Sequence, residues 1–373
     1  MKKSFKYRIK ANRSTFTRAE EVLNLCRVLY NLSLEQRRNV WKYRQKSISA
    51  NTQKKQLRDL KKTFPEFNKV PSQTLQDVIE RVDRAFQGFF RRVKSGEKPG
   101  YPRFRGYNRY DSFTLKQAGW KLIDSQLIIS KLGTFNIILH RPIEGNIKSV
   151  TIRKSASGKW YVCFSCDNVP LKPLPKTGKE IGIDMGCENF LVDSNGRKID
   201  NPRFLKKSEE SLKERQKILS RKLKGSHRRS KQRILVAKAH EKTRNQRNDF
   251  HFKIANQLVE ENDTICIEKM GSFNSFRSLT KSMRDVAWFN FFNILRFKAE
   301  GAGKEVIEVP AQNTSQICSG CGEIVHKHLN VRIHNCPHCN ISIERDFNSA
   351  INILRLGTSR QDFPVEALHF NAR

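Results

Sequence analysis

The segment Glu180-Ile-Gly-Ile-Asp-Met-Gly186 decides the fold that this 373-residue sequence predicts. Its apolar residues indicate a short buried strand with a carboxylate, Asp184, at its end. A second apolar segment, Thr264-Ile-Cys-Ile-Glu268, has the same form and ends at Glu268. A charged side chain at the end of a buried strand is costly unless a cation lies beside it. Both strand ends are therefore candidates for a metal site.

A third carboxylate, Asp346, begins the last predicted helix, which runs from 346 to 356. Three carboxylates from neighbouring elements can hold two Mg²⁺ ions about 4 Å apart, which stabilise the attacking and leaving oxygens of a phosphodiester. Position alone supports this weakly, because acidic residues commonly end strands or cap helices.

Turn signals and hydrophobic periodicity predict the elements between these acids. They are a hairpin over 190–199 with Asn195-Gly196 as its turn, two long basic helices at about 206–223 and 229–261, a helix at about 282–301 and a strand at 305–309.

Two Cys-x-x-Cys pairs, Cys318–Cys321 and Cys336–Cys339, lie fourteen residues apart. Pairs at this spacing place four thiolates around one zinc ion, and four sulfurs leave no open position, so the predicted zinc is structural. His334 and His338 are surplus as ligands, and we expect them to be solvated. Cys163 and Cys166 repeat the spacing without a second pair, and we interpret them as ordinary thiols.

The N-terminal half predicts a strand at 4–10, a helical region over 14–92 and then short strands. Within the helical region, the segment after Pro71 has apolar residues at helical spacing up to Phe90, which predicts a core-facing helix. The later strands are expected at 113–115, 127–130, 135–139, 147–152 and 160–166, followed by a proline-rich linker over 170–178.

Composition narrows the class of protein. The chain has 72 Lys and Arg against 36 Asp and Glu, a formal net charge of +36, and the basic residues are spread along the whole sequence. Such a balance favours a polyanionic partner. With 37% hydrophobic residues, a disordered polycation is excluded. No stretch approaches the roughly 20 apolar residues of a membrane span. We expect a soluble, cytoplasmic protein.

The order of these motifs resembles the TnpB family, transposon-encoded RNA-guided nucleases related to type V CRISPR effectors. The similarity covers nearly the whole chain. The matching segments are Gly182-Ile-Asp-Met-Gly, Ile267-Glu-Lys-Met, Asn313-Thr-Ser-Gln-Ile-Cys-Ser-Gly-Cys-Gly, Cys336-Pro-His-Cys, Arg345-Asp-Phe-Asn-Ser-Ala-Ile-Asn-Ile, Pro71-Ser-Gln, Ala85-Phe-Gln-Gly-Phe-Phe-Arg-Arg and Gly100-Tyr-Pro-Arg-Phe.

The resemblance implies a multidomain α+β chain with a RuvC-like nuclease of ribonuclease H fold. The implied parts are a β-barrel-like strand domain (1–13 and 111–177), a helical recognition lobe (14–110), the nuclease (178–313 and 341–358), a zinc ribbon (314–340) and a C-terminal tail (359–373). It also implies that Asp184, Glu268 and Asp346 are catalytic and hold two Mg²⁺ ions, and that Cys318, Cys321, Cys336 and Cys339 hold one Zn²⁺.

The sequence departs from the family pattern at three positions. It has Glu344 where Asp is usual, Asn340 where Gly is usual, and Ser349 where Ala is usual. None of these changes removes a carboxylate of the triad. Asn348, on the Asp346 helix, is a candidate for structural support of the site.

The implied activity is RNA-guided cleavage of double-stranded DNA beside a short motif, by two-metal-ion hydrolysis that leaves a 3′-hydroxyl and a 5′-phosphate. Guide RNA and target DNA would be the partners, and Gln73 and Gln76 are candidate contacts to the motif, since Gln can bind adenine edges. Two alternatives remain: a nuclease-inactive RNA-guided repressor, and an RNA-free RuvC-like nuclease or transposase accessory protein.

Overall fold

The computed structural model describes residues 1–107, 109–269, 280–328 and 330–359. Met270, in the motif after Glu268, lies outside these residues, and so does the predicted C-terminal tail beyond Ser359. The chain divides into two compact units, Met1–Pro170 and Leu171–Arg373. Among the described helices, none combines the length and the apolar character needed to cross a membrane.

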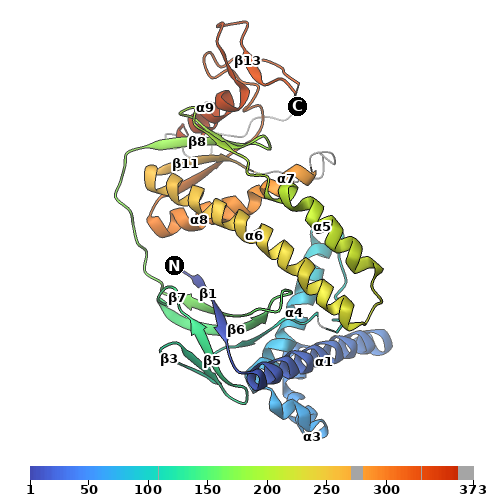
Figure 1. The fold of residues 1–373 in the computed structure, drawn as a ribbon. Helices are drawn as coiled ribbons and strands as arrows, with labels where there is room; N and C mark the ends of the chain where they lie inside the picture. Colours follow the sequence, from blue (N-terminus) through green and yellow to red (C-terminus); the bar gives the residue numbers. More distant parts are fainter. Residues whose placement is uncertain (108, 270–279, 329, 360–373) are drawn as a thin grey trace. The chain divides into compact units, whose positions relative to one another are not determined.

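The first unit contains a curled antiparallel sheet of seven strands (Figure 1). Their order across the sheet is β2-β6-β7-β1-β5-β4-β3, and the first strand of the chain therefore pairs with β7 and β5. The bounds are β1 (Lys3–Lys10), β2 (Ser112–Leu115), β3 (Trp120–Ile123), β4 (Gln126–Ile129), β5 (Gly133–Ile138), β6 (Asn146–Lys154) and β7 (Trp160–Asp167).

Alternation along β1 explains how the sheet forms a core. Phe5, Tyr7 and Ile9 are buried, while the residues between them are exposed. Side chains two apart on a strand share a face, so β1 presents one apolar face to the interior. The predicted strand at 4–10 is confirmed. Strand β3, in contrast, was not predicted, because only Trp120 and Leu122 on one face are partly buried.

Helices follow β1 and pack on the same core. The bounds are α1 (Arg13–Arg44), α2 (Ala50–Lys55), α3 (Leu57–Thr63), the 3₁₀ helix η1 (Pro65–Lys69) and α4 (Ser72–Lys94). The Asn12 side chain caps α1 by accepting a hydrogen bond from the Thr15 N–H at 2.8 Å. Helix α4 begins directly after Pro71, as predicted, but Phe90 is 61% exposed, so the predicted core role of that residue is wrong.

The second unit contains a mixed five-stranded sheet in the order β10-β9-β8-β11-β12. Strands β8, β11 and β12 are parallel to one another, and the β9–β10 hairpin runs antiparallel at one edge. The bounds are β8 (Glu180–Met185), β9 (Asn189–Asp193), β10 (Lys198–Asp200), β11 (Thr264–Glu268) and β12 (Glu305–Val309).

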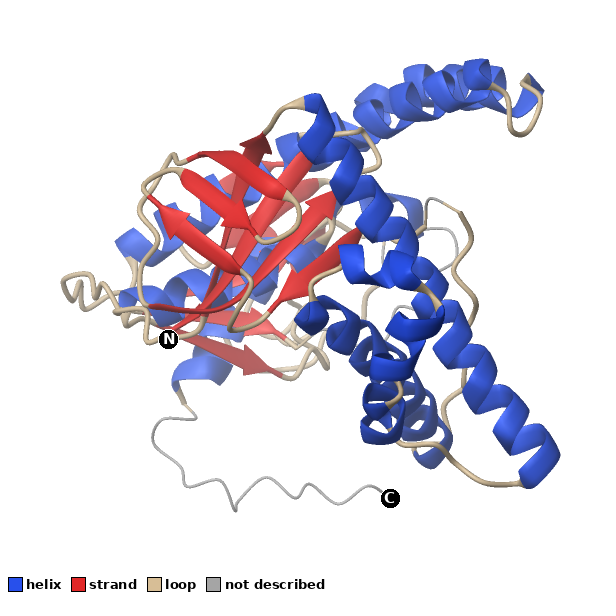
Figure 2. Ribbon diagram, turned by 90° about the horizontal axis from the view of Figure 1, so that it is seen from below, coloured by secondary structure: helices blue, strands red, loops and turns tan. Residues whose placement is uncertain are grey.

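Helices cover both faces of this sheet; strands and helices are distinguished by colour in Figure 2. On one face, Ile183 and Ile267 pack in a core with α6 and α8, and on the other face Cys266 packs with Ile353 of α9. The bounds are α5 (Phe204–Arg221), α6 (His227–Glu261), α7 (Thr280–Val286), α8 (Trp288–Ala302), α9 (Arg345–Thr358), β13 (Ile333–Asn335) and β14 (Ser342–Glu344).

The single helix predicted at about 282–301 is wrong in one respect, because it is divided into α7 and α8. Ala287 lies between them with φ = 55°, a left-handed conformation that ends a helix. Next to it, the carbonyl of Val286 bonds the Nε2 of His251 at 3.0 Å. The residue type gave no sign of this break, since Ala has the highest helix propensity of all residues.

Candidate active site

Two of the predicted acids lie side by side at one edge of the five-stranded sheet. In the parallel pairing of β8 with β11, Ile183 lies opposite Ile267. Asp184 and Glu268 are the next residue of each strand, so both occur at the carboxyl ends of adjacent parallel strands. The carboxyl ends of strands are where open α/β sheets place ligands.

Two glycines allow α9, which carries Asp346, to lie directly on this sheet. A Cβ at Gly182 of β8 would lie 2.2 Å from the carbonyl oxygen of Ala350, and a Cβ at Gly357 of α9 would lie 2.2 Å from the Sγ of Cys266. Any larger residue at either position would push the helix away from the strands. The two glycines therefore let α9 lie close across β8 and β11, with its first turn near the edge that carries Asp184 and Glu268.

Burial and like charge act on the two strand acids. Burial raises the pKa of Asp184 well above its usual range, and the charges of Glu268 and Asp346 raise it further. Burial likewise raises the pKa of Glu268. Hydrogen bonds oppose these effects: the Ser349 hydroxyl donates to Asp184 Oδ1 at 3.2 Å, and the Thr314 hydroxyl donates to Glu268 Oε1.

These electrostatics fit a divalent cation. The charges of Glu268 and Asp346 both raise the pKa of Asp184, so the three acids bring carboxylate oxygens together with an excess of negative charge around Asp184. Carboxylate oxygens are the ligands that Mg²⁺ prefers. The structure thus brings the three predicted residues, Asp184, Glu268 and Asp346, into electrostatic contact at one place.

Two arginines contact Asp346. Arg345 donates to Oδ1 through Nε at 3.0 Å and through a terminal nitrogen at 2.8 Å. Arg332 lies 3.7 Å from Oδ2 and forms a 2.9 Å ion pair with Glu188, which follows β8. Sequence analysis did not identify Arg332. It lies fourteen residues before Asp346, and the antiparallel pairing of β13 with β14, next to the backbone hydrogen bond from Arg345 to the Arg332 carbonyl, brings them together.

The four predicted zinc cysteines form one cluster, with all ligand atoms within 4.8 Å of one another. Sγ atoms of Cys318 and Cys339 are 3.5 Å apart, and those of Cys321 and Cys336 are 3.6 Å apart. It is the one such group of His, Cys, Asp or Glu ligands in the part of the chain that the structure describes; the three carboxylates do not form so tight a group. Sulfur chemistry and spacing fit structural zinc.

Local backbone geometry shapes the cysteine cluster. Asn340, which follows the last cysteine, has φ = 61°. Gly is usual at this position because it adopts this left-handed conformation most readily. Asn can replace it, since Asn tolerates the conformation better than most other residues. The expectation that His334 is solvated is wrong. Its side chain is fully buried, and its Nδ1 contacts the Nζ of Lys327.

Asparagines of α9 connect the cysteine cluster to the helix. Asn348 accepts a hydrogen bond from the Ser319 N–H at 2.8 Å and donates to the Ile317 carbonyl at 2.7 Å. Asn352 donates to the carbonyls of Thr314 and Ile317. Both side chains bind the backbone beside Cys318. Glu344, another departure from the family pattern, forms a 2.6 Å ion pair with Lys198 of β10, so it points to the hairpin.

The two candidate target-motif residues differ in their surroundings. Gln73 Oε1 accepts hydrogen bonds from the backbone N–H groups of Lys116, Gln117 and Ala118, at 3.0 to 3.1 Å. That oxygen therefore already accepts hydrogen bonds from the loop after β2. Gln76 is exposed on α4.

Comparisons with known proteins agree with this arrangement. The family profile described as "Probable transposase" (OrfB of IS605) matches residues 161–277, and the "Cas12f1-like, TNB domain" profile matches 288–353. A "Putative RNA-guided DNA endonuclease" of Streptomyces pristinaespiralis is 30% identical over 369 residues, covering 96% of this chain and 90% of that protein. The "Putative RNA-guided DNA endonuclease InsQ" of Escherichia coli K12 is 28% identical, covering 77% and 75%.

The fold has a counterpart among solved structures. A Cas12f1 chain, solved in complex with single guide RNA and target DNA, superposes with a TM-score of 0.56 at 15% identity, and the match covers 91% of this chain and 82% of that one. At this identity the match bears on the fold alone. Together with the relative that is similar along nearly its whole length, these findings show that the chain belongs to the TnpB (IS605 OrfB) family, with a Cas12f-like fold.

Proposed function

We propose that this protein is an RNA-guided DNA endonuclease, with Asp184, Glu268 and Asp346 as its catalytic carboxylates. The observation that carries the proposal is the convergence of these three acids, from β8, β11 and α9, at one sheet edge. The names of the relatives from Streptomyces and Escherichia coli support the same activity.

The five-stranded sheet supports a RuvC-like nuclease of ribonuclease H type. Its three parallel strands carry an antiparallel hairpin at one edge, and the acids lie at the carboxyl ends of two neighbouring parallel strands. In this proposal, 178–313 and 341–358 form the nuclease and 314–340 the zinc ribbon. The strand domain (1–13 and 111–177) and the helical lobe (14–110) bind nucleic acid.

The three acids would hold two Mg²⁺ ions. Bound there, Mg²⁺ supplies Lewis-acid stabilisation of the charge that develops on phosphodiester oxygens during hydrolysis. The chain's own residues hold the carboxylates in place: Ser349 orients Asp184, Thr314 orients Glu268, and Arg345 fixes one oxygen of Asp346. Phosphodiester hydrolysis at this site would leave a 3′-hydroxyl and a 5′-phosphate.

One structural zinc would be held by Cys318, Cys321, Cys336 and Cys339. Because Asn348 and Asn352 join the backbone beside Cys318 to α9, the zinc ribbon would brace the helix that carries Asp346. The ribbon therefore supports the catalytic site mechanically, and it carries no open ligand position.

Guide RNA and double-stranded DNA are the proposed partners, which accounts for the net charge of +36. Of the two glutamines, Gln76 is the better candidate for contact with the target motif. Its amide is exposed, whereas the Gln73 oxygen already accepts three backbone hydrogen bonds.

The test compares Asp184→Asn with Asp200→Asn, an exposed acid at the end of β10. Each protein is purified, its zinc content is measured, its bound RNA is sequenced, and it is given a plasmid that matches that RNA. We expect Asp184→Asn to bind the plasmid but to cut it at least about 10³-fold more slowly, since removal of a group acting in the transition state mainly lowers the rate. Asp200→Asn should cut at the original rate.

Other outcomes separate the alternatives. Full cutting by Asp184→Asn would overturn the assignment of the site. Guided binding without cutting by the unmodified protein would indicate a repressor. Cutting with no discrete co-purified RNA would indicate an RNA-free nuclease.

A further inference from the structure

The segment Gly100–Tyr107, here called the strap, lies across helices α1 and α4 within the first unit. The Asn31 side chain of α1 exchanges two hydrogen bonds with the backbone of Arg105, at 2.8 and 3.0 Å. On the α4 side, the ring of Tyr101 meets Phe86 and Phe89 edge to face, with centroids 5.7 and 5.3 Å apart. The strap is thus held at fixed points along both helices.

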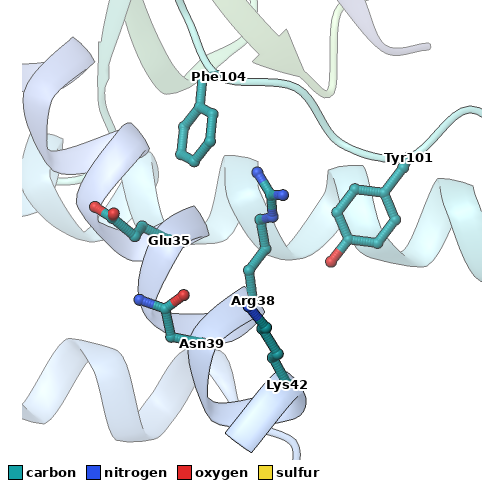
Figure 3. Close-up of a pocket in the computed structure, with 6 residues that line it drawn as sticks. All are labelled: Glu35, Arg38, Asn39, Lys42, Tyr101 and Phe104. Carbon is teal, nitrogen blue, oxygen red and sulfur yellow. The ribbon is translucent and has the colours of Figure 1, made fainter.

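A cavity of about 510 Å³ lies between the strap and the last turns of α1 (Figure 3). Glu35, Arg38, Asn39 and Lys42 follow one another at helical spacing, so they share one face of α1. Tyr101 and Phe104 of the strap lie opposite. Both rings are about half exposed, at 44% and 46%.

Arg38 is the central side chain of this cavity. Its guanidinium rises between the two rings, 5.1 Å from the centroid of Phe104 and 5.9 Å from that of Tyr101 (Figure 3). Glu35 and Asn39 lie to one side of it. The cavity therefore combines planar stacking surfaces, hydrogen-bonding groups and positive charge.

A strongly basic groove lies beside this cavity. Phe104 also lines a neighbouring cavity of about 390 Å³, and that one shares Tyr30 and Arg105 with a third of about 370 Å³. The arginines that line these two are Arg81, Arg84, Arg92, Arg103, Arg105 and Arg109, and Asp111 is the one acid in their lining. Within the described residues, Arg103, Arg105 and Arg109 form no ion pair with a carboxylate.

We propose that the groove holds a nucleic-acid backbone and that the Arg38 cavity takes one unstacked nucleotide base from it. An extruded base gains stability by stacking on aromatic rings and guanidinium planes while its edge forms hydrogen bonds. The cavity supplies both kinds of group, and the arginines supply phosphate contacts. This inference rests on the proposed nucleic-acid function and adds a binding site to it.

The polar lining favours a base with an exocyclic amino group. The Glu35 carboxylate only accepts hydrogen bonds when ionised, and the Asn39 amide both accepts and donates. Adenine, cytosine and guanine each present an exocyclic amino donor to such a pair, whereas the one donor on the pairing edge of uracil or thymine, N3–H, lies between two carbonyl oxygens that a carboxylate repels. The cavity should therefore prefer the amino-bearing bases.

The test uses the full chain, freed of RNA at high salt, and fluorescent 12-mers of rA, rC, rU, dA, dC and dT. Binding is measured by anisotropy over a range of salt. Phe104→Leu keeps apolar bulk but removes the stacking ring, and Arg105→Gln removes a groove cation. Tyr43→Leu is the matched control, since Tyr43 is an exposed aromatic residue of α1 outside the cavity.

We expect Phe104→Leu to weaken adenine and cytosine 12-mers about 5- to 100-fold with no change in the salt slope. Arg105→Gln should flatten the slope of log K against log salt by about 0.7. Tyr43→Leu should bind like the unmodified chain. The ribo and deoxyribo series show whether the base comes from the RNA or from a DNA strand.

Equal binding by Phe104→Leu and the unmodified chain would overturn the base site and leave the proposed function standing. Equal binding of the uracil or thymine and the adenine 12-mers would overturn the base preference. Failure of the unmodified chain to bind any 12-mer would count against both proposals. Phe104→Leu could lose affinity because it unfolds, which a lowered melting temperature would reveal. Arg38→Lys therefore repeats the test, because it keeps the positive charge and removes the planar group. If the base site is correct, Arg38→Lys must weaken binding of the adenine and cytosine 12-mers as well.

Discussion

His251 shows how one buried side chain affects stability. It lies on α6 among Phe190, Phe250 and Phe291, and it is almost fully buried. Its Nε2 bonds the Val286 carbonyl at 3.0 Å, and its Nδ1 lies 3.0 Å from the Asn290 amide nitrogen. With Nε2 protonated and Nδ1 accepting, both ring nitrogens of the neutral imidazole are satisfied.

This environment makes stability depend on pH. Burial lowers the pKa of His251 to about 4. The hydrogen bond to the Val286 carbonyl raises this pKa, and the positive charge of Arg247 lowers it. The unfolded chain therefore binds a proton below about pH 6.5 that the folded unit excludes until about pH 4. The stabilisation is complete above pH 6.5 and is lost as the pH falls through this window.

We predict that the second unit loses about 2 kcal/mol between pH 8 and pH 5 through this residue. His251→Phe should unfold with a flatter pH dependence, although its stability at pH 8 should fall because the Val286 carbonyl loses its donor. Urea unfolding at several pH values measures this. His240→Phe, at an exposed position of the same helix, should retain the original pH dependence. An unchanged profile for His251→Phe would contradict the argument.

At the scale of elements, the contact between α9 and the sheet is the decisive one. Helix α9 packs on β8 and β11 through Gly182 and Gly357, which lie against backbone or sulfur atoms. The hydrophobic contacts of Ile353 with Cys266 and Val309 then hold it there. This packing, and not any local property of α9, places Asp346 near the two strand acids.

We predict that Gly182→Ala destabilises the second unit by about 3 kcal/mol or more, because its new methyl group would overlap the Ala350 carbonyl and the Leu354 N–H. Cleavage should fall as well, because Asp346 would move with α9. Thermal unfolding and plasmid cleavage measure the two effects. Gly88→Ala, in α4, is the control: its methyl group would approach nothing closer than 3.8 Å, and it should gain about 0.5–1 kcal/mol of stability. Normal stability of Gly182→Ala would refute this account of the contact.

At the scale of the whole molecule, the net charge of +36 sets the conditions under which the chain is stable. Unscreened positive charges repel one another across a compact protein and destabilise it. Screening lengths fall from about 30 Å at 0.01 M salt to about 10 Å at 0.1 M. A bound polyanion relieves the same repulsion directly and shifts the equilibrium toward the folded state.

We predict that the RNA-free chain melts at a higher temperature in 0.3 M salt than in 0.01 M salt. Dextran sulfate should raise the melting temperature strongly at low salt and weakly at high salt, whereas uncharged dextran should have little effect. Differential scanning fluorimetry measures the melting temperature at both salt concentrations, without polymer and with each of the two polymers. A melting temperature that is independent of salt would show that repulsion among the basic residues is locally compensated.

Local sequence determined much of this protein. Alternating apolar residues specified β1, turn residues specified the β9–β10 hairpin, and the spacing of Cys318, Cys321, Cys336 and Cys339 specified a four-sulfur cluster. These features follow from interactions among residues close in sequence, which is why patterns reveal them. The break at Ala287 and the exposure of Phe90 escaped the same reasoning, because neighbours remote in sequence decide both.

Only the tertiary structure decided which residues meet. Asp184, Glu268 and Asp346 are separated by up to 162 positions, and the sequence marked them only by their places at element ends and through resemblance. Their shared edge depends on the register of two parallel strands and on two glycines under α9. Arg332 left no pattern in the sequence, and of the Arg38 cavity only Tyr101 and Phe104 lay in a segment marked by resemblance. Each is assembled by packing between segments distant along the chain, and local periodicity carries no information about such contacts.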